Sequence, residues 1–139
     1  MSPARALAAL AAAVLVIAAA GCRTPHYRMT DPPSFKRFPG EDGLRMIRAD
    51  GVMVKVREVE NCPLADLAFW VDAMRRHLEQ QGYALQGEPR LFDTKAGRKG
   101  ARLVFVVPRG QEDWVLGETV FVVGERIVLV ETAGPYELH

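Results

Sequence analysis

The sequence predicts an α+β fold, an antiparallel β-sheet of about five to six strands with one long amphipathic helix on one face. Apolar residues recur at helical spacing in one segment of the chain, between residues 63 and 81. The other apolar segments after residue 43 are short, rich in valine and separated by glycine, proline or aspartate, a pattern typical of strands joined by hairpins. A chain of 139 residues suits one domain rather than two.

The segment before the helix predicts a hairpin. Residues 44–47 form a short apolar run, and the Asp50-Gly51 pair that follows favours a tight turn. Residues 52–59 then alternate, with valines on one side and Lys55 and Arg57 on the other. This alternation is typical of a half-buried strand.

The helix is expected to run from Pro63 to about Gln81, with Asn61 or Cys62 as its cap and Gly82 just beyond its end. Its apolar residues form one stripe: Leu67, Trp70, Val71, Met74 and Leu78.

The remainder of the chain predicts strands and turns. A broken strand is expected over 83–92, a loop over 93–100, strands over 101–107, 114–123 and 126–132, and turns at 108–113 and 124–125. Residues 103–107 and 127–130 are apolar at successive positions, which indicates strands covered on both faces. One helix covers one face, so the second face needs the N-terminal segment, the C-terminal tail or a partner.

The first 22 residues resemble the signal of a bacterial lipoprotein. Arg5 precedes an uncharged apolar run over 6–20, which is short for a membrane span, and Ala19-Ala20-Gly21-Cys22 resembles a lipobox with alanine where leucine is usual. The resemblance implies a signal peptide over 1–21, a lipidated Cys22 that begins a Pro-rich tether over 22–40, and a domain over 41–139. The alternatives are an ordinary signal peptide that leaves Cys22 free to pair with Cys62, or an uncleaved anchor.

A lipidated Cys22 implies a protein of the cell envelope held on a membrane by its acyl chains. Arg23, rather than aspartate, follows the cysteine, which in enteric bacteria goes with the outer membrane and an orientation facing the periplasm.

The residues that catalysis needs are sparse. Beyond the predicted signal, Ser34 is the one serine, and His26, His77 and His139 lie at no metal-ligand spacing. We therefore expect no catalytic residues, no metal and no cofactor. Removing the predicted signal leaves equal numbers of acidic and basic side chains, so no nucleic-acid partner is expected.

The order of elements resembles a known fold family. A hairpin, a helix containing Asp66-Leu67-Ala68-Phe69-Trp70-Val71, and antiparallel strands ending Val-Leu-Val-Glu-Thr-Ala-Gly-Pro at 128–135 resemble the PsbP-like α/β/α sandwich. That group includes photosystem II accessory proteins, a Ran-binding nuclear import factor and small bacterial lipoproteins. The resemblance implies assembly or binding rather than catalysis. Members usually continue with a further helix after the last strand, and since His139 lies four residues past Pro135, that helix is expected to be short or absent here.

These observations favour a non-catalytic envelope lipoprotein whose domain binds a partner protein, with Trp114 as a possible contact. The alternative is a small-molecule or lipid-binding module that uses an apolar sheet face. Cys62 is expected to be buried packing rather than a reactive thiol. The basic residues Lys95, Arg98 and Lys99 are expected in a solvated loop, with contact to anionic headgroups as the alternative.

Overall fold

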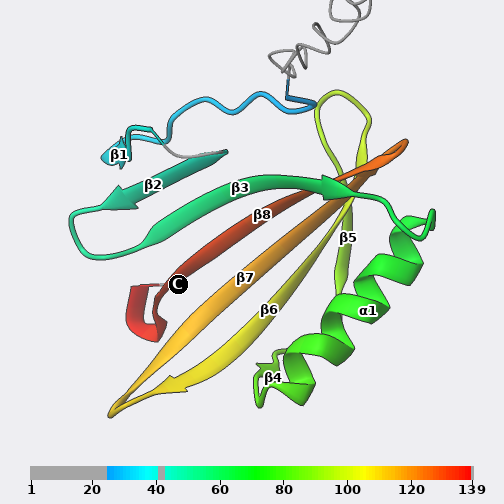
Figure 1. Ribbon diagram of the computed structural model, residues 1–139. Coiled ribbons are helices and arrows are strands. Elements are labelled where there is room, and N and C mark those ends of the chain that lie inside the picture. The colour runs from blue at the N-terminus through cyan, green and yellow to red at the C-terminus, as the bar shows by residue number, and fades with distance from the viewer. Residues whose placement is uncertain (1–24, 41–42, 139) are drawn as a thin grey trace, which may run out of the picture.

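The computed structural model describes residues 25–40 and 43–138, which form one antiparallel sheet and one helix (Figure 1). The strand order is β1-β2-β3-β8-β7-β6-β4, and β5 also pairs with β6. The elements are β1 (Phe35–Arg37), β2 (Leu44–Arg48), β3 (Met53–Glu60), α1 (Leu67–Gln80), β4 (Ala84–Leu85), β5 (Arg90–Asp93), β6 (Lys99–Arg109), β7 (Glu112–Val123), β8 (Arg126–Pro135) and a 3₁₀ turn (Tyr136–Leu138).

The predicted count of five to six strands is wrong, because the sheet has eight. One additional strand, β1, lies between Pro33 and Pro39 in the stretch predicted as a tether. An edge strand pairs on one side only, so neighbouring prolines do not prevent it. The other comes from the predicted broken strand, which divides into β4 and β5, and these pair with separate parts of β6.

The centre of the sheet is made of two long hairpins. Strands β6 and β7 stay paired out to Arg109 and Glu112, so the turn predicted over 108–113 shrinks to Gly110 and Gln111. Strands β7 and β8 are joined by Gly124 and Glu125, and Gly124 has a φ of 58°. A positive φ at the first turn residue is the type II′ geometry expected for this connection.

Helix α1 covers one face of this sheet, here called the helix face. Leu78 from its apolar stripe is buried, and the rest of the stripe packs on the same cluster, whose sheet residues are Leu103, Phe105, Val120, Ile127 and Leu129. The helix begins later than predicted, because its cap is Asp66 rather than Asn61 or Cys62. The Asp66 side chain accepts a hydrogen bond of 2.9 Å from the Phe69 amide, as a cap should.

The opposite side of the sheet, here called the second face, has a core of its own. The buried residues are Leu44, Met46, Val54, Val56 and Val128. The segment 25–31, blue in Figure 1, runs past this core, and its half-buried Tyr27 and Met29 pack against it. Among the described residues, the N-terminal segment is therefore what covers the second face.

Candidate functional site

The segment 25–31 separates two hollows on the second face, because Tyr27 and Met29 line both of them. It is held at two points. The His26 backbone N–H donates to Glu58 Oε1 over 2.6 Å, and the His26 ring lies 3.0 Å from the same oxygen. Farther along, Arg37 Nε donates to both carboxylate oxygens of Asp31, at 2.7 and 2.9 Å.

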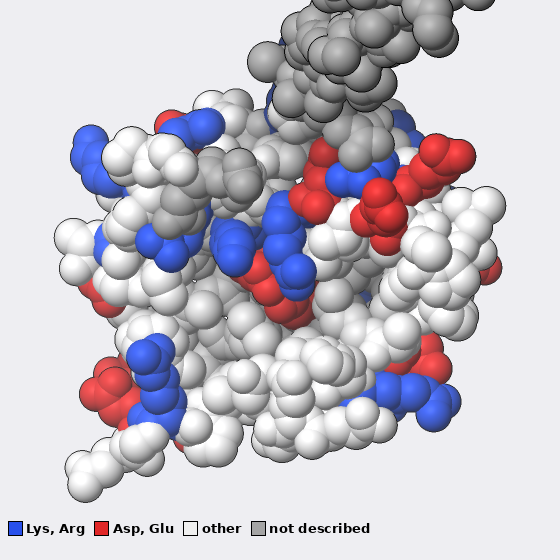
Figure 2. All heavy atoms as spheres, viewed as in Figure 1, with Lys and Arg blue, Asp and Glu red and all other residues white. Residues whose placement is uncertain are grey.

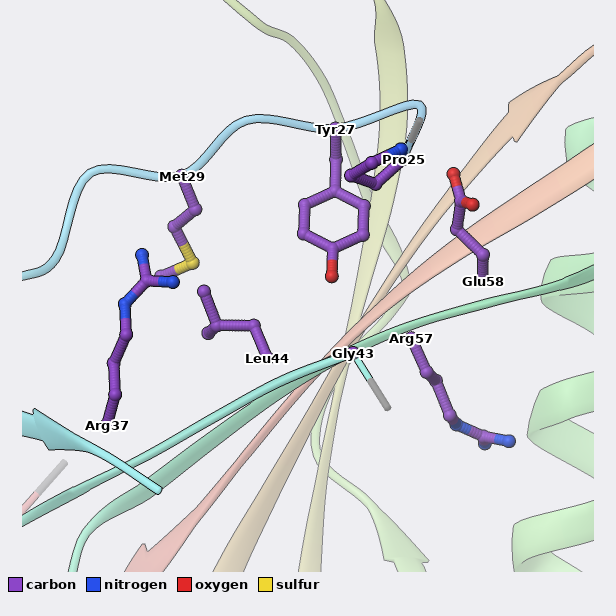
Figure 3. A pocket seen from close by; sticks show the side chains of 8 residues that line it. All are labelled: Pro25, Tyr27, Met29, Arg37, Gly43, Leu44, Arg57 and Glu58. Carbon is purple, nitrogen blue, oxygen red and sulfur yellow. The ribbon is translucent and has the colours of Figure 1, made fainter. Parts of the chain in front are cut away.

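The first hollow lies between this segment and strands β2 and β3 and has a volume of about 610 Å³. Figure 3 shows the Tyr27 ring reaching from the segment toward the sheet, with Met29 and Leu44 on one side and Glu58 on the other. Burial raises the pKa of the Tyr27 hydroxyl above its ordinary value, and the nearby Glu58 carboxylate adds to that shift. Tyr27 therefore stays a neutral hydroxyl in this hollow, able to donate or accept a hydrogen bond.

The second hollow, of about 510 Å³, lies between the same segment and the β5–β6 loop. Its floor is apolar and comes from three neighbouring strands: Val56, Phe121, Val123, Val128 and Val130. Its rim carries Arg28, Lys95 and Arg98. Two hydrogen bonds within the loop stabilise it: the Arg98 amide donates to the Thr94 hydroxyl, and the Thr94 amide donates to the Arg98 carbonyl.

A pair of carboxyl groups lies on the helix face. Glu118 in β7 is the register partner of Glu131 in β8, and Glu118 is 4% exposed. Burial and the neighbouring Glu131 raise the pKa of Glu118 to about 8, although Arg57 works in the opposite direction. The Arg57 Nε atom lies 3.4 Å from Glu131 Oε2, so the guanidinium balances mainly that partner.

Figure 2 shows charged side chains on this side of the molecule. Between the β1–β2 hairpin and the helix the surface is hollowed, and acidic side chains lie there beneath basic ones. The Oε2 atom of Glu118 is buried and has no hydrogen-bond partner among the described residues. A buried carboxyl group with a raised pKa is protonated at neutral pH and can donate one hydrogen bond.

Trp114 lies beside the β6–β7 hairpin, at the end of the sheet opposite the β5–β6 loop. It is half-buried near the start of β7, with the Arg109 guanidinium 4.5 Å from the centre of its ring. Its register partner in β8 is Pro135, and the turn that follows exposes Tyr136 and Leu138. A hollow of about 450 Å³ beside them is lined by acidic and apolar residues: Gln111, Glu112, Asp113, Pro135, Tyr136, Glu137 and Leu138.

The other residues singled out from the sequence are spread over the molecule. Cys22, the predicted lipid attachment, lies outside the described residues, as does His139. Cys62 is exposed, so its interpretation as buried packing is wrong. His77 is exposed on α1, and Ser34 is exposed at the turn before β1. Within the described ranges no group of three or more His, Cys, Asp or Glu residues could hold a metal ion.

Two features were missed from the sequence although it carries a signal for each. Glu118 has the same parity in its strand as Leu116 and Val120, so strand alternation alone places it on a core-facing side. In the N-terminal segment, Tyr27 and Met29 alternate with His26, Arg28 and Thr30, a period-two pattern that the surrounding prolines obscured.

The part of the chain that the structure describes contains no helix long and apolar enough to cross a membrane. No protein-family model and no curated protein matches the chain. Among solved structures, the chain is similar to the Ran-binding protein Mog1p of Saccharomyces cerevisiae, with a TM-score of 0.53 and 13% sequence identity. The match covers 76% of this chain and 69% of Mog1p. This likeness shows the fold alone, an antiparallel sheet with one helix as in Mog1p.

Proposed function

We propose that this protein is a non-catalytic lipoprotein of the cell envelope, anchored through Cys22, whose domain binds a partner protein at the end that carries Trp114. The observation that carries the proposal is that the predicted anchor and Trp114 lie toward opposite ends of the sheet. In Figure 1, the start of the blue segment 25–31 and the β5–β6 loop lie at one end of the sheet, and the β6–β7 hairpin and the C-terminal turn lie at the other. An anchor at residue 22 would hold the first end near the membrane and leave the second free.

The two ends also differ in chemistry. The end near residue 25 carries Arg28, Lys95 and Arg98, which suits a surface of anionic lipids. The far end combines the exposed Tyr136 and Leu138 with the half-buried Trp114 and acidic neighbours. Aromatic side chains beside a polar rim are the composition of many protein–protein contacts, so the expected partner presents an apolar surface with basic residues. Mog1p is itself a Ran-binding protein, but a likeness in fold does not transfer its partner.

The anchor is tested by metabolic labelling of cells that make the full chain with radioactive palmitate. We expect the chain to carry the label and to sediment with membranes. Cys22→Ala should lose both properties, because it removes the acylated sulfur. Cys62→Ala, which removes the other cysteine of the chain, should keep them. An unlabelled wild-type chain, or a Cys22→Ala variant that keeps the label, would remove the anchor from the proposal.

The partner site is tested with a photoreactive benzoylphenylalanine at position 136 in the full chain. We expect irradiation of living cells to give one adduct of discrete mass, and Trp114→Ala to reduce its yield. The matched control is position 69, because Phe69 is also an exposed aromatic residue, at 49%, but lies on α1. Equal adducts from both positions, or none from position 136, would contradict a partner site at the Trp114 end.

A further inference from the structure

The hollow between residues 26–29 and the β5–β6 loop has the form of a ligand site rather than of a gap in packing. Its volume of about 510 Å³ falls inside the range of roughly 300–1,000 Å³ that small-molecule sites occupy. Its floor is a continuous apolar surface from β3, β8 and β7, and Phe121, Val123 and Val130 on it are half-buried rather than closed over. An apolar ligand would therefore remove water from exposed hydrocarbon.

Phe121 is the one aromatic residue of this floor. Phe121 packs edge-to-face on Phe92, with 5.7 Å between the ring centres. The space for this pair exists because residue 100 is glycine, since a Cβ atom there would lie 2.5 Å from the Phe121 ring and 2.9 Å from that of Phe92. The Phe121 ring is thus supported by Phe92 and by the absence of a side chain at residue 100.

The rim of the hollow carries three basic side chains. In the ranges 25–40 and 43–138, no acidic side chain forms an ion pair with Arg28, Lys95 or Arg98. The neighbouring basic groups are different, because His26 is held by Glu58 at 3.0 Å and Lys99 lies 3.7 Å from Asp93. Three uncompensated cations at the mouth of an apolar hollow complement a molecule with an anionic head and a hydrocarbon chain.

We infer that this hollow binds a long-chain fatty acid, with its carboxylate at Lys95, Arg98 and Arg28 and its alkyl chain along the valine floor toward Phe121. The polar groups stand at the rim and the floor offers apolar side chains, so a ligand that is polar along its whole length would be left unsatisfied inside. This inference is independent of whether Cys22 is acylated and of any partner at the Trp114 end.

The test uses the full chain in phosphatidylcholine vesicles and hexadecanoic acid that carries a photoreactive diazirine in mid-chain. After irradiation, we expect saturable labelling of peptides that contain residues 121–123 or 128–130. Unlabelled hexadecanoate should compete, and the uncharged hexadecanol should compete poorly. Lys95→Glu combined with Arg98→Glu should weaken labelling roughly tenfold, because it reverses two rim charges.

The matched control is Lys99→Glu, which reverses a lysine at the end of the same loop that does not line the hollow. It should label like the wild-type chain. Equal labelling of all three proteins, labelling confined to peptides of α1, or no saturable labelling would overturn the inference. Competition by hexadecanol as strong as that by hexadecanoate would overturn the role of the charged rim.

Discussion

Glu118 is a residue whose position conflicts with its chemistry. Strand alternation places its side chain among Leu116, Val120 and the apolar residues under α1, and the register of β7 and β8 sets it against Glu131. Carboxylates directly opposite each other on neighbouring strands repel, and burial makes the charged form more costly still. Burial and the neighbouring Glu131 therefore raise the pKa of Glu118 to about 8, and the pair holds a proton at neutral pH.

This proton makes stability depend on pH. Below the ordinary carboxyl pKa both the folded and unfolded chains are protonated at position 118, and above it only the folded chain remains so. Stability should therefore fall as the pH rises from about 4.5 to about 8, over the interval between the unfolded and folded pKa values. Glu118→Gln should flatten this dependence in urea titrations at pH 5, 6.5 and 8.

The exposed Glu88 supplies the control, because Glu88→Gln should leave the wild-type pH dependence intact. Glu131→Gln should give a weaker version of the Glu118→Gln effect, since it removes the charged neighbour but leaves the burial. If Glu118→Gln shows the same pH profile as the wild type, the carboxyl pair does not hold the proton.

Among the elements, the loop before α1 is organised by one buried side chain. The Asn61 amide nitrogen donates to the carbonyls of Ala65 and Gly124, and its oxygen accepts from the Ala65 amide and the Trp70 indole. Its backbone N–H donates to the Glu125 carbonyl. Asn61 thus ties the helix to the β7–β8 hairpin, two elements that lie far apart in the sequence.

Asn61→Ala should destabilise the protein by about 3 kcal/mol, because it leaves several buried backbone and indole groups without partners. Asp66→Ala, which removes only the helix cap, should cost about 1 kcal/mol. Urea unfolding of the two variants provides the comparison. A smaller loss for Asn61→Ala than for Asp66→Ala would show that the loop does not depend on this side chain.

The elements also show what the sequence could predict. The helix stripe from Leu67 to Leu78, the alternation in β3 and the type II′ turn at Gly124 depend on local spacing, and the structure confirms them. The cap at Asn61 was wrong for a physical reason. Asparagine is a good cap in isolation, but here its side chain bonds to Ala65, Trp70 and the carbonyl of Gly124. The bonds to Gly124 and Glu125 come from a hairpin that is distant in the sequence, so local sequence could not reveal them.

For the molecule as a whole, the apolar runs in β6 and β8 predicted that both faces of the sheet are covered, but they left the cover of the second face open. The sequence offered three covers, the N-terminal segment, the C-terminal tail or a partner, and local hydrophobicity could not choose among them. Only the folded chain shows that Tyr27 and Met29 lie on that face. The two hollows beside them and the unpaired rim charges depend on this placement, so the candidate site could not be predicted before it.

The packing of the N-terminal segment has a measurable consequence. Tyr27→Ala combined with Met29→Ala should cost about 2 kcal/mol, because two half-buried side chains lose their contact with the sheet. Amide exchange over residues 54–56 should accelerate. The control changes the outward-facing neighbours, Arg28→Ala with Thr30→Ala, and should leave both unchanged. Equal loss in both double variants would mean that the segment lies on the sheet without stabilising it.

The two ends of the strand order have one more consequence. One edge of the sheet is β1, three residues that include Lys36 and Arg37, and the other is shared by β4, two residues, and β5, four exposed residues. Unpaired strand edges are templates on which neighbouring chains can polymerise, and short or charged edges prevent this. Among the described residues, copies crowded together in two dimensions would therefore find only edge strands of two to four residues to extend. Any association between them would depend mainly on side chains rather than on a long backbone ladder.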